Sequence, residues 1–78
     1  MKKRPKLFAI CLDNRGNEAS LIPGKVYRVR PSAPAAKRHL VRVVDESGEA
    51  YLFDEDQFVL VDFPESVRRR ILRLQRAG

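Results

Sequence analysis

The sequence predicts a mainly β protein: a small five-stranded barrel followed by one C-terminal α-helix. Short apolar runs alternate with turn residues from residue 7 to residue 63, and the last segment changes to helical periodicity. A chain of 78 residues holds one domain, and 44% apolar residues favour a folded chain over a disordered one. We therefore expect a single domain with a basic arm at 1–6, the barrel at 7–63 and the helix at 64–76.

The five strands are expected at residues 7–12, 25–30, 40–44, 50–53 and 58–61. The first is a continuous apolar run, which is typical of a strand covered on both faces. In the second, Tyr27 and Val29 alternate with arginines, so apolar and charged side chains point to opposite faces. Because a closed or nearly closed barrel removes exposed strand edges, five short strands favour that arrangement.

Turn residues separate these strands. Gly16 lies within the turn at 14–17 and Gly48 within the turn at 46–49, and both suit a positive φ. The second turn is expected to close a hairpin. Residues 31–39 contain two prolines and no apolar periodicity, so we expect an exposed loop there. The acidic stretch at 54–57 fits one turn of 3₁₀ helix.

The C-terminal segment has the pattern of an amphipathic helix. Pro64 fits the first helical position, where its missing N–H has no cost. The apolar residues Val67, Ile71 and Leu74 then recur at helical spacing, and Leu72 widens the stripe. Because so short a helix is marginal alone in water, the stripe must dock on the barrel or on a partner. The sequence leaves both arrangements open.

The net charge of +6 comes from the two ends of the chain. Residues 1–6 carry +4 and residues 64–78 carry +4, whereas residues 7–63 carry −2. A nucleic-acid-binding domain would typically carry its positive charge across the folded face. A solvated helix face and a solubilising tail explain the same residues. The candidate contacts to phosphate or to a partner are Lys2, Lys3, Arg4, Arg68, Arg69, Arg70 and Arg73.

No constellation typical of catalysis stands out. The acidic residues within 45–56 lack the spacing of an EF-hand loop, and a hairpin tip splays its side chains outward. The single cysteine, Cys11, lies in an apolar strand and fits a core residue in a reducing compartment. The apolar runs are too short for a membrane span or a signal peptide. We expect no enzyme activity, cofactor, metal or membrane association, and a cytoplasmic location.

The aromatic residues offer one further surface. Most of the six are needed for the core of so small a protein. Tyr27 and Tyr51 are the candidates for exposure, because a phenol hydroxyl seeks water or a partner, although core or half-buried packing is favoured over an exposed position. On a surface they would provide a stacking platform or part of a peptide groove.

The segments CLDNRGNEASLIPGKVYRV, RVVDESGEAYLF and LVDFPESV resemble a group of small, uncharacterised bacterial proteins with an SH3-like barrel. An Asn-x-Gly turn, a Gly-Lys-x-Tyr segment and an Asp-Glu-Ser-Gly-Glu hairpin characterise that group. Gly24, Lys25, Tyr27 and residues 45–49 match them at the same separations. The resemblance covers residues 10–67 and implies the fold, with no activity or ligand. Eukaryotic SH3 domains bind proline-rich peptides with a tryptophan, which this chain lacks.

Two function classes follow from these observations. The leading hypothesis is a non-enzymatic interaction module that binds an unknown protein partner, or itself, through its loops and its C-terminal helix. The alternative is weak nucleic-acid binding through the basic arm and the same helix. A small enzyme or metal protein is the third class, and no motif supports it.

Overall fold

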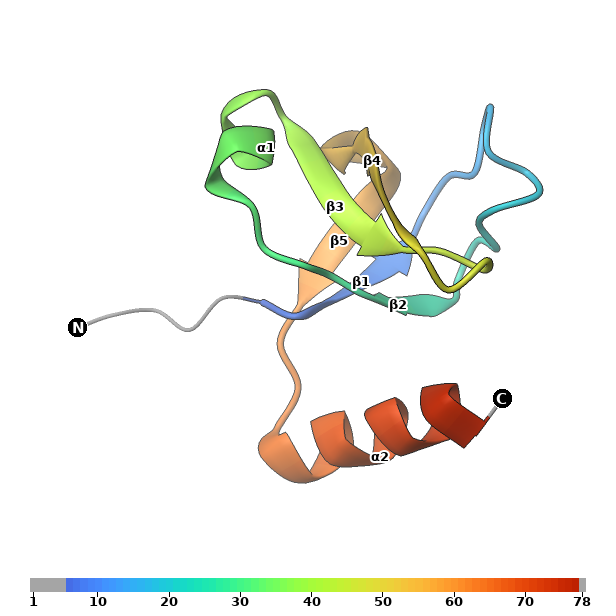
Figure 1. Cartoon of the computed structure of the whole chain (residues 1–78), viewed down its shortest axis with the longest axis vertical. Helices are drawn as coiled ribbons and strands as arrows, with labels where there is room; N and C mark the ends of the chain where they lie inside the picture. The colour runs from blue at the N-terminus through green and yellow to red at the C-terminus, as the bar shows by residue number, and fades with distance from the viewer. Residues whose placement is uncertain (1–5, 78) are drawn as a thin grey trace.

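The computed structural model describes residues 6–77, so the predicted contacts Lys2, Lys3 and Arg4 lie outside the described residues. The chain is mostly strands and ends in a long helix (Figure 1). Its elements, in chain order, are β1 (Phe8–Cys11), β2 (Val26–Arg28), α1 (Ala33–Lys37), β3 (Leu40–Val44), β4 (Ala50–Asp54), the 3₁₀ helix η1 (Glu55–Gln57), β5 (Phe58–Val61) and α2 (Glu65–Ala77).

The strands form two antiparallel sheets. One sheet has the order β2-β1-β5, and the other is the β3–β4 hairpin. A bridge between Val29 and Val43 joins them, and the N–H of Arg30 donates to the carbonyl of Arg42 at 2.9 Å. The prediction of five strands is confirmed. The closed ring is not present: among residues 6–77, no strand pairing joins β4 to β5.

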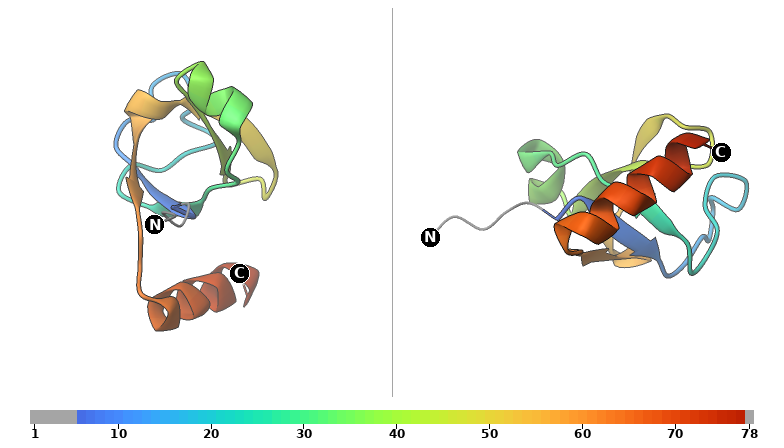
Figure 2. Two further views of the ribbon diagram at one scale, coloured as in Figure 1. Left: turned by 90° about the vertical axis from the view of Figure 1, so that its left-hand side faces the viewer. Right: turned by 90° about the horizontal axis from the view of Figure 1, so that it is seen from below.

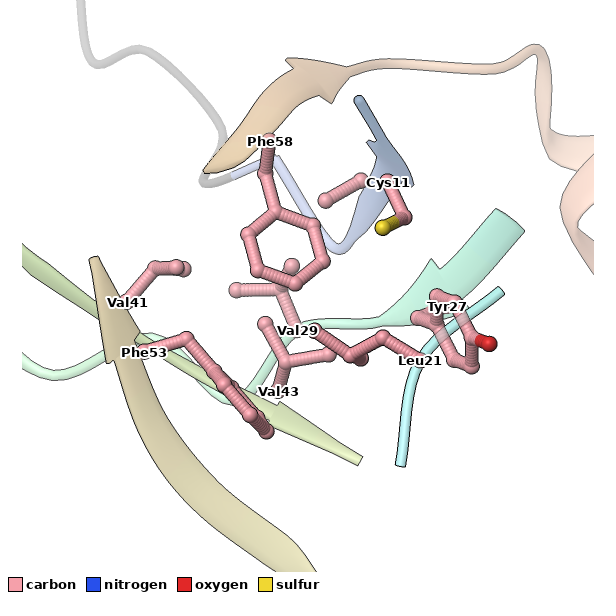
Figure 3. Packing of buried hydrophobic residues seen from close by; sticks show 9 residues of the cluster. Cys11, Leu21, Tyr27, Val29, Val41, Val43, Phe53 and Phe58 are labelled. Atoms are coloured by element: carbon pink, nitrogen blue, oxygen red, sulfur yellow. The ribbon is translucent and has the colours of Figure 1, made fainter. Parts of the chain in front are cut away.

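The core lies between the two sheets (Figure 3). Alternation along β1 turns Ala9 and Cys11 inward, and both are fully buried. The rings of Phe53 and Phe58 meet edge to face with centroids 5.8 Å apart. The core cluster consists of Ala9, Cys11, Leu21, Tyr27, Val29, Val41, Val43, Phe53 and Phe58.

The turn between β3 and β4 has the predicted glycine geometry. Gly48 has φ +86°, and its N–H donates to the carbonyl of Asp45 at 3.0 Å. The carboxylate of Asp45 accepts the N–H of Ser47 at 2.8 Å. A residue with a Cβ is strained at this φ, so glycine suits the position. The turn therefore sets the register of the hairpin, in which Val44 lies opposite Ala50.

Residues 31–39 are mostly exposed, as predicted, but they are not a loop throughout, because α1 forms within them. The backbone of Ser32 is extended, and its hydroxyl accepts the N–H of Ala35 at 3.3 Å, which caps the helix. Pro34 lies in the first turn, where no intrahelical N–H is needed. Ala35 is buried, so its side chain packs the helical turn against the strands.

Candidate interaction site

Helix α2 lies across the outer face of β1 and β2, on the side away from the core (Figures 1 and 2). It begins at Glu65, one residue later than predicted, and runs to Ala77. The carbonyl of Pro64 accepts the N–H groups of Val67 and Arg68, each at 3.0 Å, so the helical bonding starts at that residue. The helix is thus the only layer over this face in the part of the chain that the structure describes.

Two contacts connect this helical layer with the strands. Phe8 points away from the core and is only 1% exposed. Its ring meets Phe63, in the segment that leads to α2, edge to face with centroids 5.6 Å apart. At the other end of the helix, the amide of Gln75 donates to the carbonyl of Val26 at 3.2 Å. The helix is therefore held near both of its ends.

Only part of the predicted apolar stripe of α2 faces the strands, since Ile71 and Leu72 are partly buried. Arg68 is turned inward, with only 17% of its side chain exposed, and Leu72 is partly buried beside it. Val67 is 38% exposed and Leu74 is 71% exposed. Because residues 67 and 74 lie on the side of the helix next to residues 68 and 72, the fold leaves much of the predicted stripe uncovered.

A groove separates α2 from the strands. Its volume is about 290 Å³. Its apolar lining comes from both layers: Leu7, Phe8, Val29 and Val44 from the strands and their flanks, and Leu72 from the helix. Its charged lining consists of Arg28, Arg30, Glu65, Arg68 and Arg69.

Positive charge exceeds negative charge around the groove. Its one carboxylate, Glu65, lies 2.8 Å from the guanidinium of Arg69 and 3.9 Å from that of Arg68. Within residues 6–77, no ion pair joins Arg28 or Arg30 to a carboxylate. The Nε of Arg68 is buried and makes no hydrogen bond. Such an unsatisfied buried donor costs about 1–3 kcal/mol.

Of the other predicted contacts on α2, Arg70 and Arg73 are both exposed and line neither side of the groove. Arg69 is 72% exposed at the groove edge. The structure thus divides the predicted arginines, bringing Arg68 and Arg69 to the groove and leaving the others to solvent. Arg28 and Arg30 were missed as site residues, although their alternation with Tyr27 and Val29 had already placed them on the outer face.

Tyr27, one of the two candidates for exposure, is instead buried in the core. Tyr27 is 3% exposed, and its hydroxyl donates to Glu46 Oε2 at 2.6 Å while accepting the N–H of Ile22 at 2.8 Å. Burial and the bond to Glu46 raise the pKa of Tyr27. Lys25 Nζ reaches the same carboxylate oxygen at 2.6 Å. Hydrogen bonds from Lys25 and Tyr27 lower the pKa of Glu46.

This cluster shows that the residues of the Gly-Lys-x-Tyr segment and of the Asp-Glu-Ser-Gly-Glu hairpin meet in space. Their contacts join β2 to the β3–β4 turn. The hydroxyl of Tyr27 and Oε2 of Glu46 both have their hydrogen-bond partners within the chain. The motif therefore has a structural role in the fold.

Tyr51 is exposed, at 48%, as predicted. Its hydroxyl donates to Glu49 at 2.9 Å, and this bond raises the pKa of Tyr51. The neighbouring Leu52 is 53% exposed. The two tyrosines therefore lie in different environments and do not form a common platform.

The remaining reactive groups lie apart from one another. Asp45 is buried and bonded to Ser47, while Glu55 pairs with His39 at 3.3 Å. Across residues 6–77, no three His, Cys, Asp or Glu side chains are grouped so that they could hold a metal ion. Cys11 is buried in the core, and burial raises the pKa of its thiol.

Comparison of the chain with protein-family models, curated proteins and solved structures gives no match. Neither helix in the described part of the chain is long and apolar enough to cross a membrane. The groove and the helix above it therefore have to be interpreted from their own geometry and charge.

Proposed function

We propose that this chain is a non-enzymatic, cytoplasmic interaction module: an SH3-like barrel that binds a protein partner, or a second copy of itself, through α2. The strand order and the bridge between Val29 and Val43 are compatible with an open form of such a barrel. The resemblance at residues 10–67 supports the same fold.

The observation that carries this proposal is the exposure of the helix's apolar side chains. Leu74 is 71% exposed and Val67 is 38% exposed. The nearby residues Arg68 and Leu72 nevertheless line the groove beside the strands. Burying one such side chain at an interface is worth about 1.5–3 kcal/mol. When a partner covers an exposed apolar helix face, burial of these side chains stabilises the complex.

Photo-crosslinking tests this proposal. A photoreactive phenylalanine analogue replaces Leu74 in the full chain, and a matched variant carries it at Leu12, which is 59% exposed on the strand side. Both are irradiated in lysate from the source cells. The proposal predicts a discrete protein adduct, or a covalent dimer, at position 74 that position 12 does not give. Identical adducts at both positions, or none at position 74, would contradict it.

Weak nucleic-acid binding is the second candidate, and the exposure of Arg69, Arg70 and Arg73 favours it. Such binding falls steeply with salt, because each phosphate contact releases counterions. The test is a titration of mixed-sequence RNA and duplex DNA at low and moderate salt. The interaction-module proposal predicts no complex at moderate salt. A tight, salt-sensitive complex that Arg70→Ser and Arg73→Ser weaken would replace it with the second candidate.

A further inference from the structure

The groove beneath α2 combines an apolar floor with a positively charged rim. Phe8, Val44 and Leu72 form much of the floor. Arg28 and Arg30 approach the groove from the strand side, whereas Arg68 and Arg69 approach it from the helix. The two pairs of arginines come from distant parts of the sequence, and the fold brings them to one cavity of about 290 Å³.

The charges of this rim are not balanced within the described chain. Four arginines line the groove and Glu65 is the one carboxylate, which leaves an excess of three positive charges. Glu65 is already shared between Arg68 and Arg69. Like charges around the groove repel one another, and a bound anion relieves that repulsion.

Arg68 shows where such an anion would bind. Its side chain is 17% exposed and its Nε is buried without a hydrogen-bond partner. The nearest Glu65 oxygen lies 3.9 Å from its Nη2, beyond hydrogen-bond distance. A carboxylate that entered the groove could accept from Nε and Nη2 together, in the two-bond geometry that guanidinium groups favour.

We propose, building on the interaction-module function, that the groove binds an acidic peptide segment of a partner protein. One or two Asp or Glu side chains pair with Arg68 and the rim arginines, and a neighbouring aliphatic side chain enters the apolar floor. A protein segment fits this mixed lining better than nucleic acid, because it can supply a carboxylate and a neighbouring aliphatic side chain together, whereas nucleic acid carries no aliphatic side chain. A second copy would bring its own arginine-rich helix to the same positive rim.

The test uses synthetic peptides and the full chain. A short fluorescein-labelled peptide of Glu and Leu is titrated by anisotropy, beside a Glu–Ser peptide of equal charge and a Lys–Leu peptide of opposite charge. The proposal predicts that the Glu–Leu peptide binds, that the Glu–Ser peptide binds about tenfold or more weakly, and that the Lys–Leu peptide does not bind. Equal binding of the two acidic peptides would overturn it, because the apolar floor would then contribute nothing.

Matched arginine variants locate the site. Arg30→Ser and Arg69→Ser each remove one rim charge, whereas Arg70→Ser removes the same charge from an exposed part of the same helix. We expect about tenfold weaker binding for each rim variant, equivalent to about 1.4 kcal/mol, and less than twofold for the control. Equal losses in all three variants would show binding by net charge alone and would contradict the groove.

The Nε–H resonance of Arg68 provides a readout independent of affinity. In ¹⁵N-arginine-labelled protein, the Glu–Leu peptide is expected to shift this signal and to slow its exchange with water, because the donor gains an acceptor. An unchanged signal at saturating peptide would overturn the proposal. So would RNA that displaces the peptide and binds more tightly, or a dimer that forms in its place. A protein adduct at position 74 together with failed peptide binding would leave the interaction module standing and remove only this inference.

Discussion

The hydroxyl of Tyr27 lies 2.6 Å from Glu46 Oε2, and this hydrogen bond ties β2 to the turn between β3 and β4. The same hydroxyl accepts the N–H of Ile22, and Lys25 reaches the same carboxylate oxygen. Two segments that are distant along the sequence, residues 22–27 and the turn that contains Glu46, therefore meet at one buried phenol. These hydrogen bonds explain why the Gly-Lys-x-Tyr segment and the acidic hairpin are found together, because Lys25 and Tyr27 of the first bind Glu46 of the second.

Replacing Tyr27 with Phe should destabilise the fold. The change removes both hydrogen bonds while the buried ring remains, so the N–H of Ile22 loses its partner. We expect a loss of about 1–3 kcal/mol in the free energy of unfolding, measured from the urea midpoint. Tyr51→Phe is the control, since its exposed hydroxyl should cost less than about 0.5 kcal/mol. Equal effects of the two variants would contradict the described role of Tyr27.

The same cluster predicts a pH dependence on the acid side. Hydrogen bonds from Lys25 and then Tyr27 hold the pKa of Glu46 below its ordinary value of 4.5. A lowered pKa means that the unfolded chain binds the proton more readily. The contribution of Glu46 to the free energy of unfolding is therefore complete above pH 4.5, and it is lost as the pH falls through the folded-state pKa of Glu46.

Glu46→Gln should flatten the fall in stability below pH 4.5, measured by urea unfolding across a series of acid buffers. Glu18→Gln controls for the general loss of one negative charge, because Glu18 is exposed in a different turn. If the stability of Glu46→Gln fell as steeply below pH 4.5 as that of the unmodified chain, the described role of Glu46 would be refuted.

Among the residues on the outer face of the strands, Phe8 should cause the largest loss in the free energy of unfolding when it is truncated to alanine. It is 1% exposed and packs against Phe63 beneath the helical layer. Phe8→Ala removes a large buried ring and should cost about 3–5 kcal/mol. Phe63→Ala, at a partly buried position, should cost clearly less in the same thermal or urea unfolding experiment. A smaller loss for Phe8→Ala than for Phe63→Ala would contradict this packing.

The exposed stripe of α2 should contribute little to the stability of the isolated chain. Val67→Ala and Leu74→Ala are each expected to change the free energy of unfolding by less than about 0.5 kcal/mol. Leu72→Ala, which removes a side chain from the groove lining, should cost more. Urea unfolding of the three variants gives the comparison. Costs at position 74 that match those at position 72 would show that the stripe packs within the chain.

The sequence was sufficient to predict the strands and the C-terminal helix, because apolar periodicity reports local structure directly. Tyr27 and Val29 were placed correctly on one face of their strand. The partner that allows Tyr27 to be buried could not be predicted, because its hydroxyl is satisfied by Glu46, which lies 19 residues away and is indicated by no local pattern.

Two other features depend on contacts that periodicity does not report. Helix α1 was missed because its prolines suggested a loop, whereas the Ser32 cap and the burial of Ala35 stabilise a helical turn. The rotation of α2 was also not predictable. The apolar stripe indicated that the helix would dock, but which side faces the strands depends on two distant contacts. Phe63 meets Phe8 just before the helix, and Gln75 bonds to Val26 near its end.

Native-state hydrogen exchange of α2 would show whether the helix presents its surface to a partner or belongs to the core of the fold. If its surface is kept for a partner, few contacts hold the helix, and its amides should exchange by local opening at a free energy well below that of global unfolding. The amides of Ala9 and Cys11 in β1 should report the global value. We therefore expect clearly lower protection in α2 than in β1. Equal protection in both, with a single free energy of opening, would show that the helix is an integral part of the core and would contradict this expectation.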